Sequence, residues 1–505
     1  MTKEQIGRAA LADSELALMR ALHFVRSRWL LLTAISVAIL LPCFWHKRIE
    51  AGDLASHTYN AWLAQLIERG QAPGLYLAPQ RTNILVDVAL LRLGSVIGFT
   101  AAEKIVVALC VLIFFWGAFA LVAAASQKPP WFLLPAIAMI AYGWTFQMGF
   151  MNYYLSLGLG FCAAALFWRG RSADYIAAAV LMLLALLAHP MGFVCIAGAV
   201  VYIKLAESTS RWRRWALFMA AFLIVFLIHH YIVHHFRTQY WDTSFFFLMN
   251  GADQLVLYGS RYSKLAMAAI LFGSVCFIYA DRREGRGTPE RWRFRTPLEL
   301  WGILLFTAAM IPELIQLPIY PGPVAFPVSR LTSITAVMGL CTLGYMRPRT
   351  WHLAGFTVVA ALFFAFLYRD TGTLNQMEEQ AENLVSTVPY GRRVTETIGT
   401  PPDSRIFFIN HMVDRACIGR CFTYSNYEPS FGQFRVRVRP GSPLVTDSPA
   451  ASQAMEYGNY LVRPEDLPMT QIYQCDEKDP TQLCMRDLTA GEKNGRIGYY
   501  HSSLP

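Results

Sequence analysis

A carboxylate and an imidazole stand four residues apart in the segment 52–76, whose sequence is GDLASHTYNAWLAQLIERGQAPGLY. If this segment is helical, Asp53 and His57 lie one turn apart and reach into the same space. A carboxylate held there can remove a proton from a hydroxyl group, and an imidazole can contact an oxyanion or a metal ion. Two plainer interpretations stay open. Asp53 is also a favoured helix N-cap, and a lone histidine on a surface helix commonly has neither chemical role.

The same segment has the pattern of a short amphipathic helix. Apolar side chains recur at intervals of three and four residues, and Gly70 with Pro73 provides a stop. We expect this helix to lie at the outer membrane surface, directly after the first apolar run. The neighbouring residues that can contact a substrate there are Glu50, Tyr59 and Asn60.

Ionisable residues also occur at the outer ends of apolar segments, where such groups are costly and point to function. Glu313 precedes the turn 317–321, and Arg330 follows inside the next apolar segment. The planar guanidinium of Arg330 suits a phosphate oxygen, while the alternative is a structural Glu313–Arg330 ion pair. His189, at the outer end of another segment, can line the same cavity.

Composition divides the 505-residue chain into two parts. Hydrophobic residues make up 55% of the chain and charged residues 15%, against about 25% charged in soluble globular proteins. Residues 1–368 hold 30 basic and 17 acidic residues, whereas residues 369–505 hold 14 basic and 17 acidic ones. We therefore expect a polytopic membrane domain at 29–368 and one soluble-type domain at 369–505. The net charge of +10 then reflects basic loops on one membrane face, and we expect no nucleic-acid partner.

The orientation follows from the basic residues. Residues 1–28 are too long and too charged for the start of a signal peptide, so we expect a cytoplasmic N-terminal tail and a retained first span. The positive-inside rule keeps the basic connections in the cytoplasm. It places the first external loop, 46–81, and the tail, 369–505, outside. The basic connections are the N-terminal tail, Arg169/Arg171, Arg211/Arg213/Arg214, the run 282–295 and Arg347/Arg349.

We expect about eleven crossings of the membrane. One candidate segment must not cross, because an even count would return the tail to the cytoplasm. We choose 131–150, which Pro135, Gly143 and Gly149 interrupt, as a re-entrant segment bordering a site. The alternative, that 84–99 lies along the interface, gives the same count. The candidate segments are 29–45, 84–99, 105–125, 131–150, 153–168, 175–188, 191–206, 215–233, 265–280, 298–317, 324–346 and 351–368.

The tail mixes short apolar runs at 405–409 and 434–438 with Pro/Gly breaks, which predicts a small mixed α/β or α+β domain. It contains an even set of cysteines, for which disulfides are the first expectation outside the cytoplasm and a zinc site is the alternative. The pairing stays open. The disulfide candidates are Cys417, Cys421, Cys475 and Cys484.

Two further clusters have weaker patterns. His230 and His234 stand one turn apart and can bind a metal ion, but no acidic or thiol ligand is adjacent, so histidines facing lipid headgroups are the favoured interpretation. Arg435, Arg437 and Arg439 alternate along an expected strand and share one face. That face can hold an anionic acceptor or simply contact solvent.

The acidic residue that opens the first external loop, the juxtamembrane helix behind it, the many spans and the external C-terminal domain together resemble the GT-C superfamily of integral membrane glycosyltransferases. The resemblance implies an all-α polytopic membrane protein with a small mixed α/β extracytoplasmic domain. It also implies inverting transfer of a sugar from a polyprenyl-phosphate donor to a lipid, glycan or protein acceptor at the outer face. Asp53 matches the position of the general base, and His57 and Arg330 are the expected partners of the leaving phosphate, with His57 counted among the catalytic residues. That family's loop often carries two neighbouring carboxylates, whereas Leu54 follows Asp53 here, so a divalent cation stays a candidate cofactor and no metal ligand is assigned.

Other classes remain as alternatives. A secondary transporter is expected to show repeated halves with charges near the midplane, and no repeat is apparent. A non-enzymatic membrane scaffold that binds a lipid or a partner is the third hypothesis. The sequence contains no GxxxxGK[ST], GxSxG or HExxH pattern. It therefore lacks the residues that are usual in ATP-driven transporters, serine hydrolases and zincins. We expect a bacterial inner-membrane protein whose tail is periplasmic.

Overall fold

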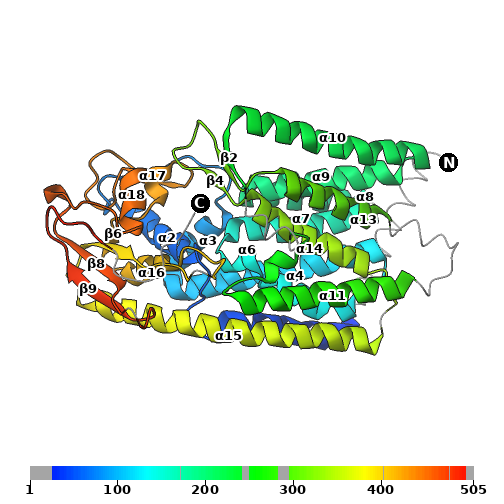
Figure 1. Cartoon of the computed structure of the whole chain (residues 1–505), viewed down its shortest axis with the longest axis horizontal. Coiled ribbons are helices and arrows are strands. Elements are labelled where there is room, and N and C mark those ends of the chain that lie inside the picture. The colour runs from blue at the N-terminus through cyan, green and yellow to red at the C-terminus, as the bar shows by residue number, and fades with distance from the viewer. Residues whose placement is uncertain are drawn as a thin grey trace.

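The computed structural model describes residues 26–170, 172–240, 249–281, 295–347, 349–401, 403–476 and 478–495. Most of the expected cytoplasmic tail, 1–28, and nearly all of the basic run 282–295 lie outside the described residues, as does Arg171. The helices run roughly parallel to the long axis of the molecule (Figure 1). The small sheet of the C-terminal segment lies at one end of this helical body, away from the end marked N (Figure 1).

Among the described residues, seven helices are long and apolar enough to cross a membrane. The remaining helices of the body are shorter: α3 (Leu85–Ile97), α8 (Ser172–Ala188), α13 (Arg295–Met310) and α14 (Pro327–Leu343). The expected count of about eleven crossings therefore stays a prediction. The seven spans are Arg26–Phe44, α4 (Phe99–Ser126), α7 (Met151–Arg169), α9 (Pro190–Glu207), most of α10 (Arg211–His235), most of α11 (Ser260–Asp281) and α15 (Thr350–Thr387).

The segment 131–150 is broken, as its glycines predicted. It consists of a 3₁₀ turn (Trp131–Leu133), α5 (Leu134–Ala141) and α6 (Trp144–Gln147). Pro135 does not interrupt it, because proline is tolerated in the first turn of a helix. Gly149 has a φ of +80°, and a Cβ there would lie 2.3 Å from the backbone nitrogen of Leu54. The glycine thus lets this loop approach the start of the first external helix.

The C-terminal segment contains a four-stranded mixed sheet in the order β6-β5-β8-β9. The central strand β5 (Arg393–Thr397) is parallel to β6 (Phe422–Thr423) and to β8 (Met469–Gln474), and β9 (Leu483–Asp487) is antiparallel to β8. The accompanying helices are α16 (Met412–Cys417), α17 (Glu428–Phe431) and α18 (Pro449–Glu456). The mixed α/β character matches the expectation, and α15 continues through the expected boundary at 368.

Two smaller sheets join distant parts of the chain. Strand β1 (Leu75–Leu77), in the first external loop, pairs antiparallel with β7 (Val436–Val438) of the C-terminal segment. This pairing brings the first external loop and the C-terminal segment together. The other small sheet has the order β2-β3-β4 and consists of Arg237–Gln239, Leu314–Gln316 and Val324–Ala325.

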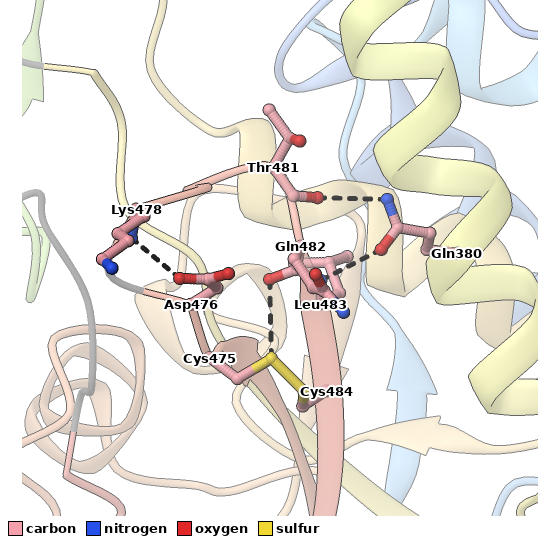
Figure 2. The surroundings of a disulfide bond; sticks show 8 residues. All are labelled: Gln380, Cys475, Asp476, Lys478, Thr481, Gln482, Leu483 and Cys484. Atoms are coloured by element: carbon pink, nitrogen blue, oxygen red, sulfur yellow. Dashed lines mark hydrogen bonds between the residues drawn. A yellow bond between two sulfur atoms is a disulfide. The ribbon is translucent and has the colours of Figure 1, made fainter.

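All four tail cysteines form disulfides, as predicted. Cys417 pairs with Cys421, and Cys475 pairs with Cys484. Figure 2 shows the second pair beside the polar end of α15, where the side chain of Gln380 binds the hairpin. Gln380 Nε2 donates to the Thr481 carbonyl at 3.1 Å, and its Oε1 accepts from the Leu483 amide at 3.1 Å. These bonds attach the last hairpin to α15.

Candidate active site

Asp53 directly precedes α2 (Leu54–Glu68), the helix expected in the loop 46–81. The expectation of an amphipathic helix at the surface was wrong: twelve of its fifteen residues are buried, because the C-terminal segment covers its polar side. Its side chain makes no capping hydrogen bond to that helix, so the plainer interpretation of Asp53 as an N-cap does not describe its contacts. The backbone amide of Asp53 donates to the Met148 carbonyl at 3.0 Å. The carboxylate is 5% exposed, and its Oδ1 accepts a hydrogen bond of 2.9 Å from the hydroxyl of Tyr427. Asp53 is therefore a buried carboxylate that does not cap its own helix.

His57 lies one turn further along α2 and faces Asp53, with 3.6 Å between its Nε2 and Asp53 Oδ2. Its other ring nitrogen, Nδ1, lies 2.7 Å from Oδ1 of Asp87 on α3. Asn152 at the start of α7 donates to the second oxygen of Asp87 at 3.0 Å. Burial lowers the pKa of His57, but the carboxylates of Asp87, Asp53 and Glu428 outweigh burial and raise it to about 10. His57 is thus an imidazolium held in place by Asp87.

A second histidine approaches Asp53 from the C-terminal segment. His411 Nε2 lies 3.8 Å from Asp53 Oδ1, and His411 Nδ1 lies 2.7 Å from Oδ2 of Asp414 on α16. Burial lowers the pKa of His411, but the hydrogen bond and charge of Asp414, with the charge of Asp53, raise it to about 9. The buried Nε2 of His411 has no hydrogen-bond partner among the described residues. Its N–H is therefore a free donor beside Asp53.

Asp53 consequently lies between two imidazolium groups, each fixed by a carboxylate on its far side. The two Nε2–Oδ distances, 3.6 and 3.8 Å, exceed the normal range of hydrogen bonds. The pairs are close enough for strong electrostatic attraction, but neither Nε2 atom is within hydrogen-bond distance of Asp53. The arrangement thus places two positively charged rings beside the buried Asp53 carboxylate.

Several members of this cluster were not among the sequence candidates, namely Asp87, His411, Asp414, Tyr427 and Glu428. Asp87 could have been recognised as a candidate from the sequence, because it is a carboxylate inside the apolar segment 84–99. No sequence pattern points to His411 and Tyr427, because they lie more than 350 residues from Asp53 in the chain and reach it only through tertiary packing.

Glu428, the first residue of α17, closes the cluster. Its Oε1 accepts a hydrogen bond of 2.8 Å from Ser56 Oγ on α2. Burial raises the pKa of Glu428, and the nearby carboxylates of Asp53 and Asp87 add to this effect, while His57 opposes it; the resulting pKa is about 8. A carboxyl group that takes up a proton can donate as well as accept hydrogen bonds.

Arg330 on α14 borders the same region. Its guanidinium carbon lies 4.0 Å from the ring centroid of Phe150 and 5.9 Å from that of Tyr153, and it interacts electrostatically with Asp53. The buried Nε of Arg330 has no hydrogen-bond partner within the described part of the chain. Glu313 also interacts electrostatically with Arg330. Its Oε2 binds the N-terminus of α14, accepting from the amides of Val328 at 3.0 Å and Ser329 at 3.3 Å.

His189 lies near Arg330 but acts as a helix cap. Its Nδ1 accepts a hydrogen bond of 3.2 Å from the Met191 amide at the start of α9. Its ring packs edge-on against Tyr153 with 5.3 Å between centroids, and the Tyr153 hydroxyl donates to the Arg330 carbonyl at 2.8 Å. Tyr153 thus joins His189 to the backbone of Arg330.

Glu50 lies in a different cluster, around the buried Arg415 of α16. Arg415 contacts Glu103 of α4 at 2.8 Å, Glu50 at 3.5 Å, and Glu378 of α15. Burial raises the pKa of Glu50 well above its usual range, and the charge of Glu378 adds to this effect while Arg415 opposes it. The cluster joins the C-terminal segment to two long helices.

Tyr59 and Asn60 both contact the C-terminal segment. The Tyr59 hydroxyl accepts a 2.9 Å hydrogen bond from the Thr423 amide, and Asn60 Oδ1 accepts one of 3.1 Å from Asn426 Nδ2. A substrate contact for Tyr59 stays a prediction, while Asn60 also lines a pocket beside the Asp53 cluster.

No group of three or more His, Cys, Asp and Glu side chains within the described ranges is arranged to hold a metal ion. His234 Nδ1 lies 2.8 Å from the His230 carbonyl, an ordinary contact within helix α10. Of the alternating arginines, Arg437 lies on β7, and Arg439 lies over the Tyr76 ring at 5.6 Å.

Comparisons with known proteins give one distant likeness. No family model and no curated protein matches the chain. The solved structure of the arabinofuranosyltransferase AftD from mycobacteria is similar over 83% of this chain, with 16% sequence identity and a TM-score of 0.38. The chain spans about a third of the length of that protein, since 33% of it is covered. A likeness at this level does not establish a common fold.

Proposed function

We propose that this chain is an inverting membrane glycosyltransferase, which moves a sugar from a polyprenyl-phosphate donor to an acceptor with Asp53 as general base. The observation that carries the proposal is the buried Asp53 carboxylate held between His57 and His411. A general base must be ionised, within reach of the acceptor hydroxyl, and fixed in direction. The two imidazolium groups and the Tyr427 hydroxyl supply the charge and the direction.

In the proposed reaction, an acceptor hydroxyl oxygen attacks the anomeric carbon of the donor sugar. The new C–O bond forms as the bond to the phosphate oxygen breaks, and polyprenyl phosphate leaves with the electron pair. Asp53 takes the hydroxyl proton. One positioned carboxylate is sufficient for such a single displacement, whereas a retaining mechanism requires a second carboxylate as nucleophile.

His57 and His411 act as positioning residues in this scheme. Both lie within 4 Å of the base, while the leaving group of an in-line displacement must lie on the opposite side of the sugar. They therefore serve to keep Asp53 ionised and aligned. Asp87 and Asp414 hold each ring through Nδ1 and direct Nε2 towards the base.

Arg330 is the proposed partner of the leaving phosphate. It is a permanently charged group whose buried Nε is unpaired within the described residues, and it interacts electrostatically with Asp53. A planar guanidinium can bind two phosphate oxygens at once, and charge placed where the leaving group develops its own charge lowers the barrier. The apolar helices around it suit the polyprenyl chain.

The proposed topology follows the positive-inside expectation: the protein lies in a bacterial inner membrane with its C-terminal segment in the periplasm. Tyr427 and His411 of that segment then complete the site at the outer face, together with the first external loop. The pairing of β1 with β7 and the contacts of α2 with the C-terminal segment support this assembly.

The experiment that tests the function uses the full chain in proteoliposomes with a panel of radiolabelled polyprenyl-phosphate pentoses and hexoses. We expect release of free polyprenyl phosphate together with transfer of the labelled sugar to an added membrane or cell-wall extract. Movement of intact donor between leaflets without cleavage supports the transporter alternative and refutes the proposal. Binding of every donor without cleavage or movement favours the scaffold.

A further inference from the structure

The two-stranded sheet of β1 and β7 has one apolar face and one cationic face. Backbone hydrogen bonds of 2.8 Å extend the pairing by one residue at each end, from the Ala78 amide to the Arg435 carbonyl and from the Arg439 amide to the Gly74 carbonyl. Side chains alternate between the two faces of a strand. The apolar set packs into the core and consists of Leu75, Leu77, Val436 and Val438. The opposite set, here called the cationic face, consists of Gly74, Tyr76, Ala78, Arg435, Arg437 and Arg439.

The cationic face holds three arginines and no carboxylate. Arg439 and Tyr76 are exposed, and the guanidinium carbon of Arg439 lies 5.6 Å from the centroid of the Tyr76 ring. Arg437 Nε donates to the Phe434 carbonyl, and the electrostatic interactions of Arg437 are with the hydroxyl groups of Tyr76 and Tyr320. Neither Arg437 nor Arg439 forms an ion pair with another residue that the structure describes.

The other surface arginines show how unusual this is. Arg392 lies against Asp487 at 3.1 Å, and Arg435, at the inner end of the cationic face, lines a small cavity together with Asp87 and Glu428. Arg437 and Arg439 therefore carry the unbalanced charge of the face. Positive charge without a counter-charge attracts an anionic partner.

The face begins next to the candidate active site. The ring of Phe434, one residue before Arg435, lies 5.6 Å from the ring of Tyr427, whose hydroxyl binds Asp53. Figure 1 shows α17, which leads into β7, nearer to the C-terminal sheet than the end of α10 that leads into β2. The face thus lies beyond the apolar helical body, where a partner in the aqueous phase fits better than a lipid headgroup.

The spacing of the side chains suits a linear partner. Neighbours on one face of a strand are about 7 Å apart, so the arginines form a row along β7. A polymer with repeated negative groups contacts more than one guanidinium at once, and each guanidinium can bind a carboxylate or a phosphate through two hydrogen bonds. The exposed ring of Tyr76 lies within this row and offers an apolar surface to the C–H groups of a sugar ring.

From these observations we infer that the cationic face binds an anionic polysaccharide, and that this polysaccharide is the acceptor of the proposed transferase. This inference rests on the proposed function. Arg437 and Arg439 bind the negative groups of the chain, Tyr76 packs against one of its sugar rings, and the end of the chain passes Phe434 towards Asp53. Of the three acceptor classes expected from the sequence, the face selects the glycan.

The test measures binding of fluorescently labelled oligosaccharides to the full chain in nanodiscs of zwitterionic lipid, by fluorescence anisotropy. The probes are an oligogalacturonate, which carries carboxylates, and a phosphorylated oligomannoside. An uncharged oligogalactoside and an oligoglutamate serve as references. We expect at least one anionic oligosaccharide to bind, more weakly as the ionic strength rises, and both references to bind more weakly than that probe.

The double substitution Arg437→Gln with Arg439→Gln should weaken this binding about tenfold, because it removes both unpaired charges. The matched control, Lys47→Gln with Arg392→Gln, removes the same charge from side chains that already face carboxylates. It should keep the affinity within about threefold. If thermal unfolding shows that the double variant does not fold, Arg439→Gln alone replaces it, since Arg439 is exposed.

Unchanged binding in the folded arginine variant overturns the inference, and so does an original chain that binds neither anionic oligosaccharide or binds oligoglutamate as tightly. Phosphatidylglycerol that copurifies with the original chain but not with the arginine variant would assign the face to lipid and overturn it as well. Transfer assays separate the two proposals, because Asp53→Asn should keep oligosaccharide binding while losing transfer. If the original chain binds the oligosaccharide but transfers no sugar, the proposed function fails while the binding face stands. If the arginine variant transfers sugar normally, the inference fails while the proposed function stands.

Discussion

The substitution Asp53→Asn tests the centre of the proposed mechanism with little change in shape. Asparagine retains an oxygen that can accept the 2.9 Å hydrogen bond from Tyr427, but it carries no charge and does not take up a proton. At an effective dielectric constant of about 20, a full charge 3.6–3.8 Å from each imidazolium contributes about 4–5 kcal/mol of Coulomb attraction per pair. The substitution removes both attractions together with the base.

We expect the turnover rate of Asp53→Asn to fall about 10²–10⁴-fold, the usual contribution of a general base. The chain should still fold, because Asp87 and Asp414 continue to hold the two histidines through Nδ1. The assay is transfer of radiolabelled sugar from a polyprenyl-phosphate donor in proteoliposomes, with thermal unfolding of the same preparation measured in parallel.

The matched control is Asp487→Asn, which removes the charge of an exposed aspartate paired with Arg392. A surface pair of this kind contributes about 0–1 kcal/mol, so this variant should keep both its rate and its stability. A folded Asp53→Asn variant whose turnover lies within threefold of the original chain refutes the assignment of the base.

The pKa of His57 is raised from 6.5 to about 10 on folding. Its stabilising contribution is therefore full below pH 6.5 and is lost as the pH rises to about 10. The midpoint of thermal unfolding should fall over that range, and less steeply in His57→Gln, because the contribution of His57 is then absent while those of His411, with its pKa of about 9, and Glu428, with its pKa of about 8, remain; equal slopes would contradict this assignment. Arg330→Gln should lower kcat/KM for the donor about 10²-fold and Arg330→Lys less, because lysine keeps the charge without the planar fork; unchanged donor kinetics in both would show that Arg330 does not bind the phosphate. Arg415→Met should destabilise the chain by about 3–5 kcal/mol, because it leaves buried carboxyl groups without their cation. Arg392→Met at the surface should cost at most about 1 kcal/mol, and equal thermal midpoints for these two variants would refute the importance of the buried cluster.

Local spacing was enough to predict part of the site. Asp53 and His57 share one helix, so their proximity follows from helical geometry alone. His411 and Tyr427 could not be found in this way, because their approach depends on the pairing of β1 with β7 and on the packing of α16 against α2. Arg330 was singled out because a permanent charge in an apolar segment is unusual, and its role in the site stays a prediction. The sequence could not decide whether Arg330 pairs with Glu313, because that depends on side-chain contacts in the folded chain.

Hydropathy predicted where helices occur better than where they end. Segment 84–99 is apolar, yet α3 stops at Ile97, and Gly98, with a φ of +85°, turns the chain directly into α4. The expected segment 298–317 is shortened because residues 314–316 form strand β3. The boundary expected at 368 marks a change in composition, but residues 376–382 (QMEEQAE) are good helix formers, and α15 continues to Thr387.

The length of α15 has a mechanical consequence. Its 38 residues span about 57 Å at 1.5 Å per residue, whereas the hydrocarbon layer is about 30 Å thick. The part of α15 that exceeds this thickness is a continuous helix, in which Glu378 contacts Arg415 and Gln380 binds the last hairpin. This helical extension therefore fixes the distance and the orientation of the C-terminal segment relative to the apolar part of α15. An inserted pair of residues would turn everything beyond it by about 200°, and His411 would no longer meet Asp53.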